Sequence, residues 1–215
     1  MTNPPPVSFP DFLDQAQTCD VVIFTGTSPV SLLVETLTVG FFSHTAMVVV
    51  EPATGDKYLW QTVSETLQPD PLFPGGQAHS GAQLGALKPT MIEVVDYHDD
   101  PTWRQLQYDR PADFDQQVWD ALKPLDNRPF PDLPILGANY ISGVYLNEVE
   151  NDGPMFCSQL VTYIMQQVQL LDGSRPANSV APSDFSSEIR KRPAVPLLGQ
   201  FLPDRKIALA PATTA

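Results

Sequence analysis

Ser43-His-Thr-Ala-Met-Val-Val-Val50 is the stretch on which the fold inference rests. Its run of apolar and β-branched residues predicts a buried strand that starts at His44. The segment Pro52-Ala-Thr-Gly-Asp56 has turn chemistry, and Lys57-Tyr-Leu-Trp-Gln-Thr-Val63 is again rich in strand formers. The three segments together predict an antiparallel hairpin.

Hydrophobic periodicity and capping residues predict further elements on both sides of this hairpin. The expected strands cover residues 20–25, 91–97 and 206–209, and the expected helices cover residues 8–17, 29–38, 111–122, 136–149, 156–171 and 183–190. Residues 68–89 are rich in Pro and Gly with little periodicity, so a long loop is expected there.

Length and composition favour a single domain over residues 1–215. The chain has 215 residues, of which 42% are hydrophobic, which is enough for one substantial core. The Pro-rich start and the small, polar end are expected to be mobile tails, over residues 1–7 and 210–215.

The charge balance limits the class of partner. The sequence has 25 Asp and Glu residues against 12 Lys and Arg, and the resulting field repels phosphate backbones. Nucleic acid is therefore not an expected partner. No apolar run approaches the ~20 residues that span a bilayer, and no signal peptide is visible. We expect a soluble, cytoplasmic protein whose oligomeric state the sequence leaves open.

Cys157 is predicted at the start of the helix over residues 156–171. Backbone N–H groups and the helix dipole at such a position favour the thiolate over the thiol, as a nucleophile requires. The alternative is an inert, buried thiol, which is the commoner fate of a free cysteine. Cys19, the other cysteine, is expected in the core, and two cysteines are too few for a disulfide scaffold.

A cysteine nucleophile needs a base, and His44, His79 and His98 are the histidines of the chain. His44 is the best candidate because a strand start is rigid enough to aim an imidazole ring, whereas the other two fall in or beside predicted loops. The alternative is a histidine satisfied by the local backbone.

A third polar group is expected to accept the other N–H of His44 and so fix its tautomer. A hairpin turn near Thr54 places the region of Gln61 opposite residues 45–47, within reach of His44. Gln61 is the predicted third residue, with Glu65 as the alternative. The cysteines and histidines show no close ligand spacing, so no metal site and no cofactor are expected.

Three stretches carry a family resemblance: Asp20-Val-Val-Ile-Phe, Phe42-Ser-His-Thr-Ala-Met-Val and Phe156-Cys-Ser-Gln-Leu-Val161. Together they resemble the circularly permuted branch of the NlpC-type papain-like superfamily, which includes the YiiX/YaeF-like hydrolases and the lecithin:retinol acyltransferase-like enzymes. In that branch the histidine strand precedes the cysteine helix, as His44 precedes Cys157 here. The segment Pro182-Ser-Asp-Phe185 also looks like the family's region after that helix.

The resemblance implies an α+β, permuted papain-like fold in which an antiparallel sheet packs against helices and the nucleophile starts a helix. It also implies a cysteine hydrolase, of amidase or peptidase type, that acts on a small-molecule, peptide or lipid-like amide or ester through a thioester at Cys157. The family pattern usually has an acidic residue where this chain has Gln61. Two alternatives remain open: a thiol acyltransferase of the same fold, and an inactive relative that binds a peptide or lipid.

Overall fold

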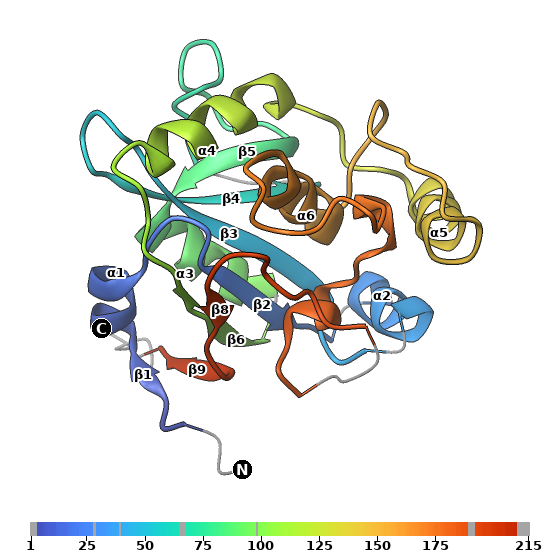
Figure 1. Cartoon of the computed structure of the whole chain (residues 1–215), viewed down its shortest axis with the longest axis horizontal. Helices are drawn as coiled ribbons and strands as arrows, with labels where there is room; N and C mark the ends of the chain where they lie inside the picture. Colours follow the sequence, from blue (N-terminus) through green and yellow to red (C-terminus); the bar gives the residue numbers. More distant parts are fainter. Residues whose placement is uncertain are drawn as a thin grey trace.

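The computed structural model describes residues 4–27, 29–38, 40–64, 68–97, 99–188 and 192–209. Within them the main sheet has seven strands in the order β1-β9-β6-β2-β3-β4-β5, and β7 pairs with β8 beside it (Figure 1). The strands are β1 (Val7–Ser8), β2 (Val21–Thr25), β3 (His44–Val50), β4 (Lys57–Val63), β5 (Gly81–Ala86), β6 (Asp99–Arg104), β7 (Leu106–Gln107), β8 (Gln200–Phe201) and β9 (Arg205–Ala208).

Neighbouring strands of the main sheet are antiparallel except for the parallel pair β1 and β9. The helices are α1 (Phe9–Gln15), α2 (Pro29–Thr38), α3 (Leu87–Tyr97), α4 (Phe114–Leu122), α5 (Leu133–Ile141) and α6 (Cys157–Gln167). Short helical turns are η1 (Lys123–Leu125), η2 (Ser142–Leu146), η3 (Ala177–Ser179) and η4 (Pro182–Phe185). The fold is therefore α+β, with a mostly antiparallel sheet packed against helices.

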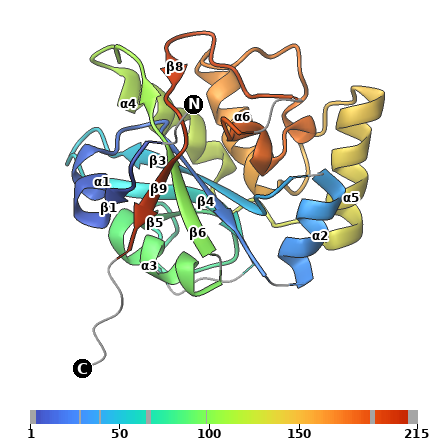
Figure 2. The same cartoon turned by 90° about the horizontal axis from the view of Figure 1, so that it is seen from below.

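Side-chain alternation along the strands gives the sheet a core on each face. Met47, Val49 and Trp60 face α4 and α6, whereas Ala46 and Val48 face α1 and α3. Figure 2 shows α4 and α6 on the opposite side of the sheet from α3. Because both faces are covered, β3 is buried along almost its whole length, as its continuous apolar run predicts.

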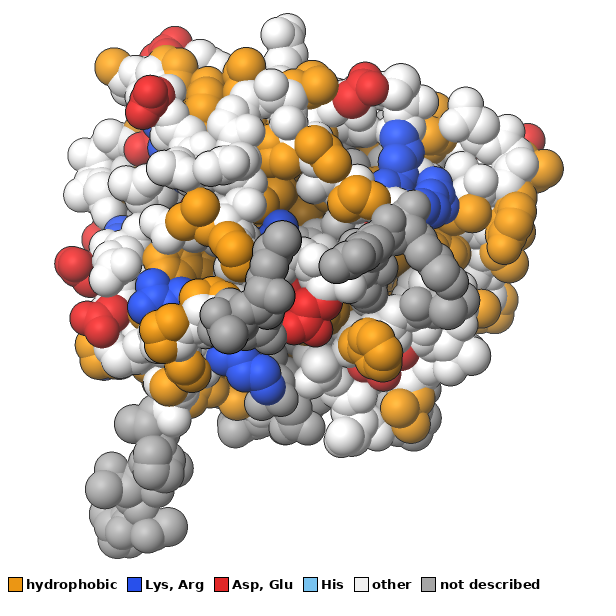
Figure 3. All heavy atoms as spheres, turned by 60° about the horizontal axis from the view of Figure 1, so that its bottom comes forward, with side chains coloured by type: hydrophobic (Ala, Val, Ile, Leu, Met, Phe, Trp, Pro, Cys, Tyr) orange, Lys and Arg blue, Asp and Glu red, His pale blue; other side chains and the backbone are white. Residues whose placement is uncertain are grey.

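Two helices lie beyond the end of the sheet at which β3 begins. α2 and α5 lie side by side there (Figures 1 and 2), and a Cβ on Gly137 of α5 would touch Leu37 of α2 at 3.8 Å. None of the described helices is both long and apolar enough to cross a membrane. Acidic side chains are spread over the face in Figure 3 and do not gather in one patch.

Several predicted elements are confirmed. The hairpin of β3 and β4, the strand β2, the helix α2 and the strand β9 lie where the sequence indicates. Ser8 caps α1 by accepting a hydrogen bond from the N–H of Asp11 at 3.2 Å. The N-terminal tail is shorter than predicted, because Val7 pairs with Ile207 and is 1% exposed. Residues 210–215 lie outside the described residues.

The region after the hairpin was predicted wrongly. Residues 91–97 belong to the helix α3 and not to a strand, because Leu87, Met91 and Val94 form a helical stripe that packs on the sheet. The expected loop over residues 68–89 contains β5, whose Gly85 weakens the strand pattern. Gly85 is required because a Cβ there would lie 2.2 Å from the Thr90 hydroxyl.

The boundaries of the later predicted helices also differ. The helix expected over residues 136–149 starts earlier, as α5 at Leu133, and continues as a π-helical turn through Leu146. The helix expected over residues 156–171 ends at Gln167. The one expected over residues 183–190 is only the 3₁₀ turn η4 within the described residues.

Asp20 connects the central strands to the segment after β6. The carboxylate is fully buried and accepts hydrogen bonds from Trp103 Nε1 at 2.9 Å and from the Leu106 N–H at 2.9 Å. Arg110 Nη2 lies 3.3 Å from it. Burial raises the pKa of Asp20 to about 6, against the opposing effect of these donors.

Asp20→Ala is expected to lower the free energy of unfolding by about 3 kcal/mol, because it leaves buried donors without an acceptor. Urea unfolding followed by circular dichroism measures the change. Asp14→Ala, at an exposed carboxylate of α1, is the control and is expected to change stability by less than about 0.5 kcal/mol. Equal effects of the two substitutions would contradict the structural role of Asp20.

Candidate active site

The site begins where β3 and β4 separate. Their ladder runs from Val50 opposite Lys57 to Met47 opposite Trp60, and β4 then continues with β5 alone through Val63. The N–H of Thr45, beyond the last β3–β4 pair, is hydrogen-bonded to the thiol of Cys157. The first residue of α6 therefore lies against the opening between the two strands.

The start of α6 is held by its own buried polar side chains. The hydroxyl of Ser158 donates to the Val180 carbonyl at 2.7 Å, and the Gln159 side chain donates to the carbonyl of Glu150. Phe156 precedes the helix in extended conformation. These contacts fix the direction of α6 relative to β3, and so the position of the sulfur.

Two opposing effects act on the pKa of the Cys157 thiol. Burial raises the pKa of the Cys157 thiol to about 11, while the N–H groups of Thr45, Ser158 and Cys157 itself lower it. Burial dominates, so the thiol is protonated at neutral pH when no base takes its proton. A helix start alone does not make this cysteine a thiolate, and its chemistry requires a proton acceptor.

His44 stands at the start of β3 and is 5% exposed. Its Nε2 lies 2.9 Å from Oε1 of Gln61 on β4. With the Gln61 oxygen as acceptor, Nε2 donates the proton of this hydrogen bond, and Nδ1 is then the second ring nitrogen of the neutral imidazole. The ring also packs against Phe24, with the two centroids 5.6 Å apart.

Cys157, His44 and Gln61 line one cavity of about 450 Å³. Apolar side chains form most of its wall and come from α2, α3, α5 and the segments between them. They are Val34, Leu37, Val63, Val94, Phe130, Leu133, Leu136, Tyr140 and Phe156. Polar groups in the wall include Asp132 and Thr62, and the Thr62 hydroxyl is buried without a hydrogen-bond partner.

The structure brings the main predicted residues together. The hydrogen bond between His44 and Gln61 has the form expected from the hairpin register, and both residues line the same cavity as Cys157. Glu65, the alternative third residue, and His98 lie outside the described residues. Cys19 is a fully buried core residue, as expected.

Sequence reasoning missed the other parts of the site. The contact between the Thr45 N–H and the Cys157 thiol was not predicted. Thr45 directly follows His44, so a thiol close to His44 can also be close to the Thr45 backbone. The cavity walls from α2 and α5 depend on tertiary packing, for which the sequence gives no direct signal. His79 was set aside as a base, and it lies in a separate cluster with Asp70 and Asp126.

No family model and no curated protein match the chain. Among solved structures, the chain is similar to the metalloprotein yiiX from Escherichia coli O157:H7, DUF1105, with 15% sequence identity and a TM-score of 0.48. The similarity covers 74% of this chain and 71% of that one. The permuted papain-like assignment and the role of Cys157 stay predictions.

Proposed function

We propose that this protein is a cysteine hydrolase that cleaves an amide or ester bond through a thioester on Cys157. His44 acts as general base and then general acid, and Gln61 is the positioning residue that orients its ring. The observation that carries the proposal is the His44–Gln61 hydrogen bond in the wall of the cavity that Cys157 also lines. An inert structural thiol requires no oriented imidazole beside its cavity.

The chemistry follows from the orientation of His44. Its Nδ1 takes the thiol proton as the sulfur attacks the carbonyl carbon, and the N–H of Cys157 stabilises the oxyanion. The imidazolium then protonates the leaving nitrogen or oxygen as the bond to the carbonyl carbon breaks, which leaves the thioester. Water, deprotonated by Nδ1, attacks the thioester, and the acid leaves as the thiol regains its proton.

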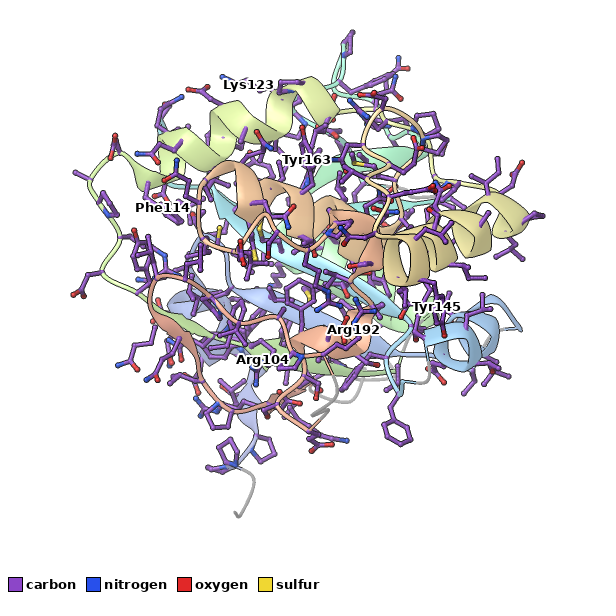
Figure 4. The ribbon with its side chains drawn as sticks, turned by 45° about the vertical axis from the view of Figure 1, so that its right-hand side comes forward. Arg104, Phe114, Lys123, Tyr145, Tyr163 and Arg192 are labelled. Atoms are coloured by element: carbon purple, nitrogen blue, oxygen red, sulfur yellow. The ribbon has the colours of Figure 1, made fainter. Side chains whose placement is uncertain are left out.

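The cavity supports a substrate with an apolar acyl group. Its wall is mostly aliphatic and aromatic, and its 450 Å³ lies in the range of small-molecule sites. The α5–η2 segment, whose α5 part lines the cavity, also has exposed apolar side chains: Ile141 is 48% exposed, Leu146 64% and Tyr145, labelled in Figure 4, 78%. An apolar cavity near exposed apolar side chains fits an amphiphilic amide or ester better than a small, fully polar one.

A binding protein without catalysis is the second candidate function. Two observations favour it: the pKa of Cys157 is raised to about 11 by burial, and Gln61 is a neutral amide. An amide orients imidazole but stabilises imidazolium less than a carboxylate does.

Alkylation of Cys157 by iodoacetamide, followed by mass spectrometry from about pH 6 to about pH 10, tests the base. The parent chain is expected to react near neutral pH because His44 accepts the thiol proton. His44→Ala is expected to react about 100-fold more slowly at neutral pH and to gain roughly tenfold per pH unit, since hydroxide must then form the thiolate.

Cys19 is the internal control for labelling. It is fully buried, and burial raises its pKa, so Cys157→Ser is expected to show no labelling over the same pH range. Equal alkylation rates for the parent and His44→Ala would contradict the proposed hydrolase and favour a binding protein.

Activated aryl esters of increasing acyl length test catalysis and substrate class. We expect a burst of aryl alcohol, a thioester mass on Cys157, and a kcat/KM that rises about fourfold per added CH₂ until the cavity is filled. Cys157→Ser is expected to lose the burst. An added amine that diverts product from acid to amide would identify an acyltransferase, whereas a missing burst for every ester would contradict both activities.

Gln61 variants test the positioning role. Gln61→Ala is expected to lower kcat/KM about 10–100-fold because the imidazole loses its orientation. Gln61→Glu is expected to retain activity and to shift the acid limb of the pH profile to higher pH, because a carboxylate stabilises the imidazolium. The pH profile is a readout that a purely structural role would not move.

The matched control is Gln83→Ala, at the buried glutamine directly opposite Gln61 on β5. It is expected to lower stability and leave the pH profile unchanged. If Gln61→Glu and Gln83→Ala both leave the profile of the parent, Gln61 does not act through His44.

A further inference from the structure

Asp70, His79 and Asp126 form a cluster apart from the cavity residues. Each offers one ligand atom, and the three atoms lie within 4.8 Å of one another. Asp70 and His79 belong to the segment before β5, and Asp126 follows η1. The Asp70 side chain is fully buried, and that of His79 is 8% exposed. The proposed hydrolase does not use this cluster.

The ring of His79 is held with both nitrogens facing oxygen acceptors. Nδ1 lies 2.8 Å from the Ser80 carbonyl oxygen, so it donates its proton there. Nε2 lies 3.1 Å from Oδ2 of Asp70. The ring stacks on Phe73 with centroids 4.3 Å apart. In the neutral ring the Nε2 lone pair would face a carboxylate, so a proton or a metal cation is required between them.

Asp126 adds a second carboxylate to the cluster, and one of its oxygens lacks a hydrogen-bond partner. Its Oδ1 is buried and has no hydrogen-bond partner. Burial and the neighbouring Asp70 carboxylate both raise the pKa of Asp126. A cation bound by all three residues would give both Nε2 of His79 and Oδ1 of Asp126 a partner.

The carboxylate of Asp70 is itself oriented by the backbone. The N–H of Leu72 donates to Oδ1 and the N–H of Leu84 donates to Oδ2, each at 2.8 Å. Outer contacts of this kind, like the bond from His79 to the Ser80 carbonyl, fix the direction of metal ligands. Asp70 and His79 are therefore oriented before any ion binds.

We propose that Asp70, His79 and Asp126 bind a divalent transition-metal ion, with Zn²⁺ the best match. One imidazole and two carboxylates suit Zn²⁺, whereas Ca²⁺ takes six to eight oxygen ligands. Bonds of ~2.1 Å in tetrahedral geometry place ligand atoms ~3.4 Å apart, close to the 3.1 Å between Nε2 of His79 and Oδ2 of Asp70. Three protein ligands leave a fourth position for water.

A bound ion would stabilise β5, the strand at the edge of the sheet next to Gln61. β5 pairs with β4, where Gln83 lies opposite Gln61, and Ala82 of β5 exchanges hydrogen bonds with the segment after Asp126. These bonds join the Ala82 N–H to the Arg128 carbonyl at 2.7 Å and the Asn127 N–H to the Ala82 carbonyl at 2.8 Å. Metal binding thus connects the segment before β5, the strand itself and the segment after η1.

Isothermal titration of the chelator-treated full chain with Zn²⁺ tests the site. We expect one Zn²⁺ per chain with a dissociation constant at or below about 1 μM, and a rise in Tm of about 5 °C at 100-fold excess over that constant. His79→Gln and Asp126→Asn are each expected to weaken binding by about 100-fold or more. Both substitutions roughly keep the size of the side chain. Asp70 is not substituted, because it also accepts hydrogen bonds from two backbone N–H groups.

Cys157→Ser is the control for zinc bound at the thiol, and it is expected to bind Zn²⁺ as the parent does. Co²⁺ substitution gives a second readout: visible bands without thiolate-to-cobalt charge transfer are expected. No Zn²⁺ binding by the folded parent, parent-like affinity in both His79→Gln and Asp126→Asn, or loss of binding in Cys157→Ser alone would each overturn the site.

Discussion

The end of the β3–β4 ladder is the constraint on which the site depends. The β3–β4 ladder ends at Met47 and Trp60, and Thr45, which still pairs with Ile23 on β2, lies just beyond it. An N–H group buried without an acceptor costs about 1–3 kcal/mol, and the sulfur of Cys157 accepts that of Thr45. The start of α6 therefore lies where the β3–β4 ladder ends, and His44 is next to Thr45 in β3.

The strand and turn residues of the sequence correctly predicted the hairpin that contains His44. The turn at residues 52–56 fixes the register of the hairpin, and the register brings Gln61 within hydrogen-bond reach of His44. β5 and α3 were missed for a physical reason. Gly85 lowers strand propensity but leaves room for Thr90 of α3 against β5, and Leu87, Met91 and Val94 pack in the core on that face. Tertiary contact outweighs local preference there.

The site was predictable in its chemistry and less so in its surroundings. A cysteine at a helix start and a histidine at a strand start are visible in the sequence, whereas the walls from α2 and α5 arise only from packing. The cluster of Asp70, His79 and Asp126 was missed because its members are too far apart in sequence to show ligand spacing. Folding brings them together through β5 and the turn after α4.

Burial raises the pKa of Cys157, and the neutral amide of Gln61 adds no negative charge beside His44, so both features disfavour a thiolate–imidazolium pair. A buried thiolate–imidazolium pair needs charge stabilisation, which a carboxylate at position 61 would supply and an amide supplies only through its dipole. In the proposed enzyme the buried thiol of Cys157 is therefore protonated at rest. Charge forms only as Nδ1 of His44 takes the proton during attack, so the reaction depends on the orientation that Gln61 gives the ring.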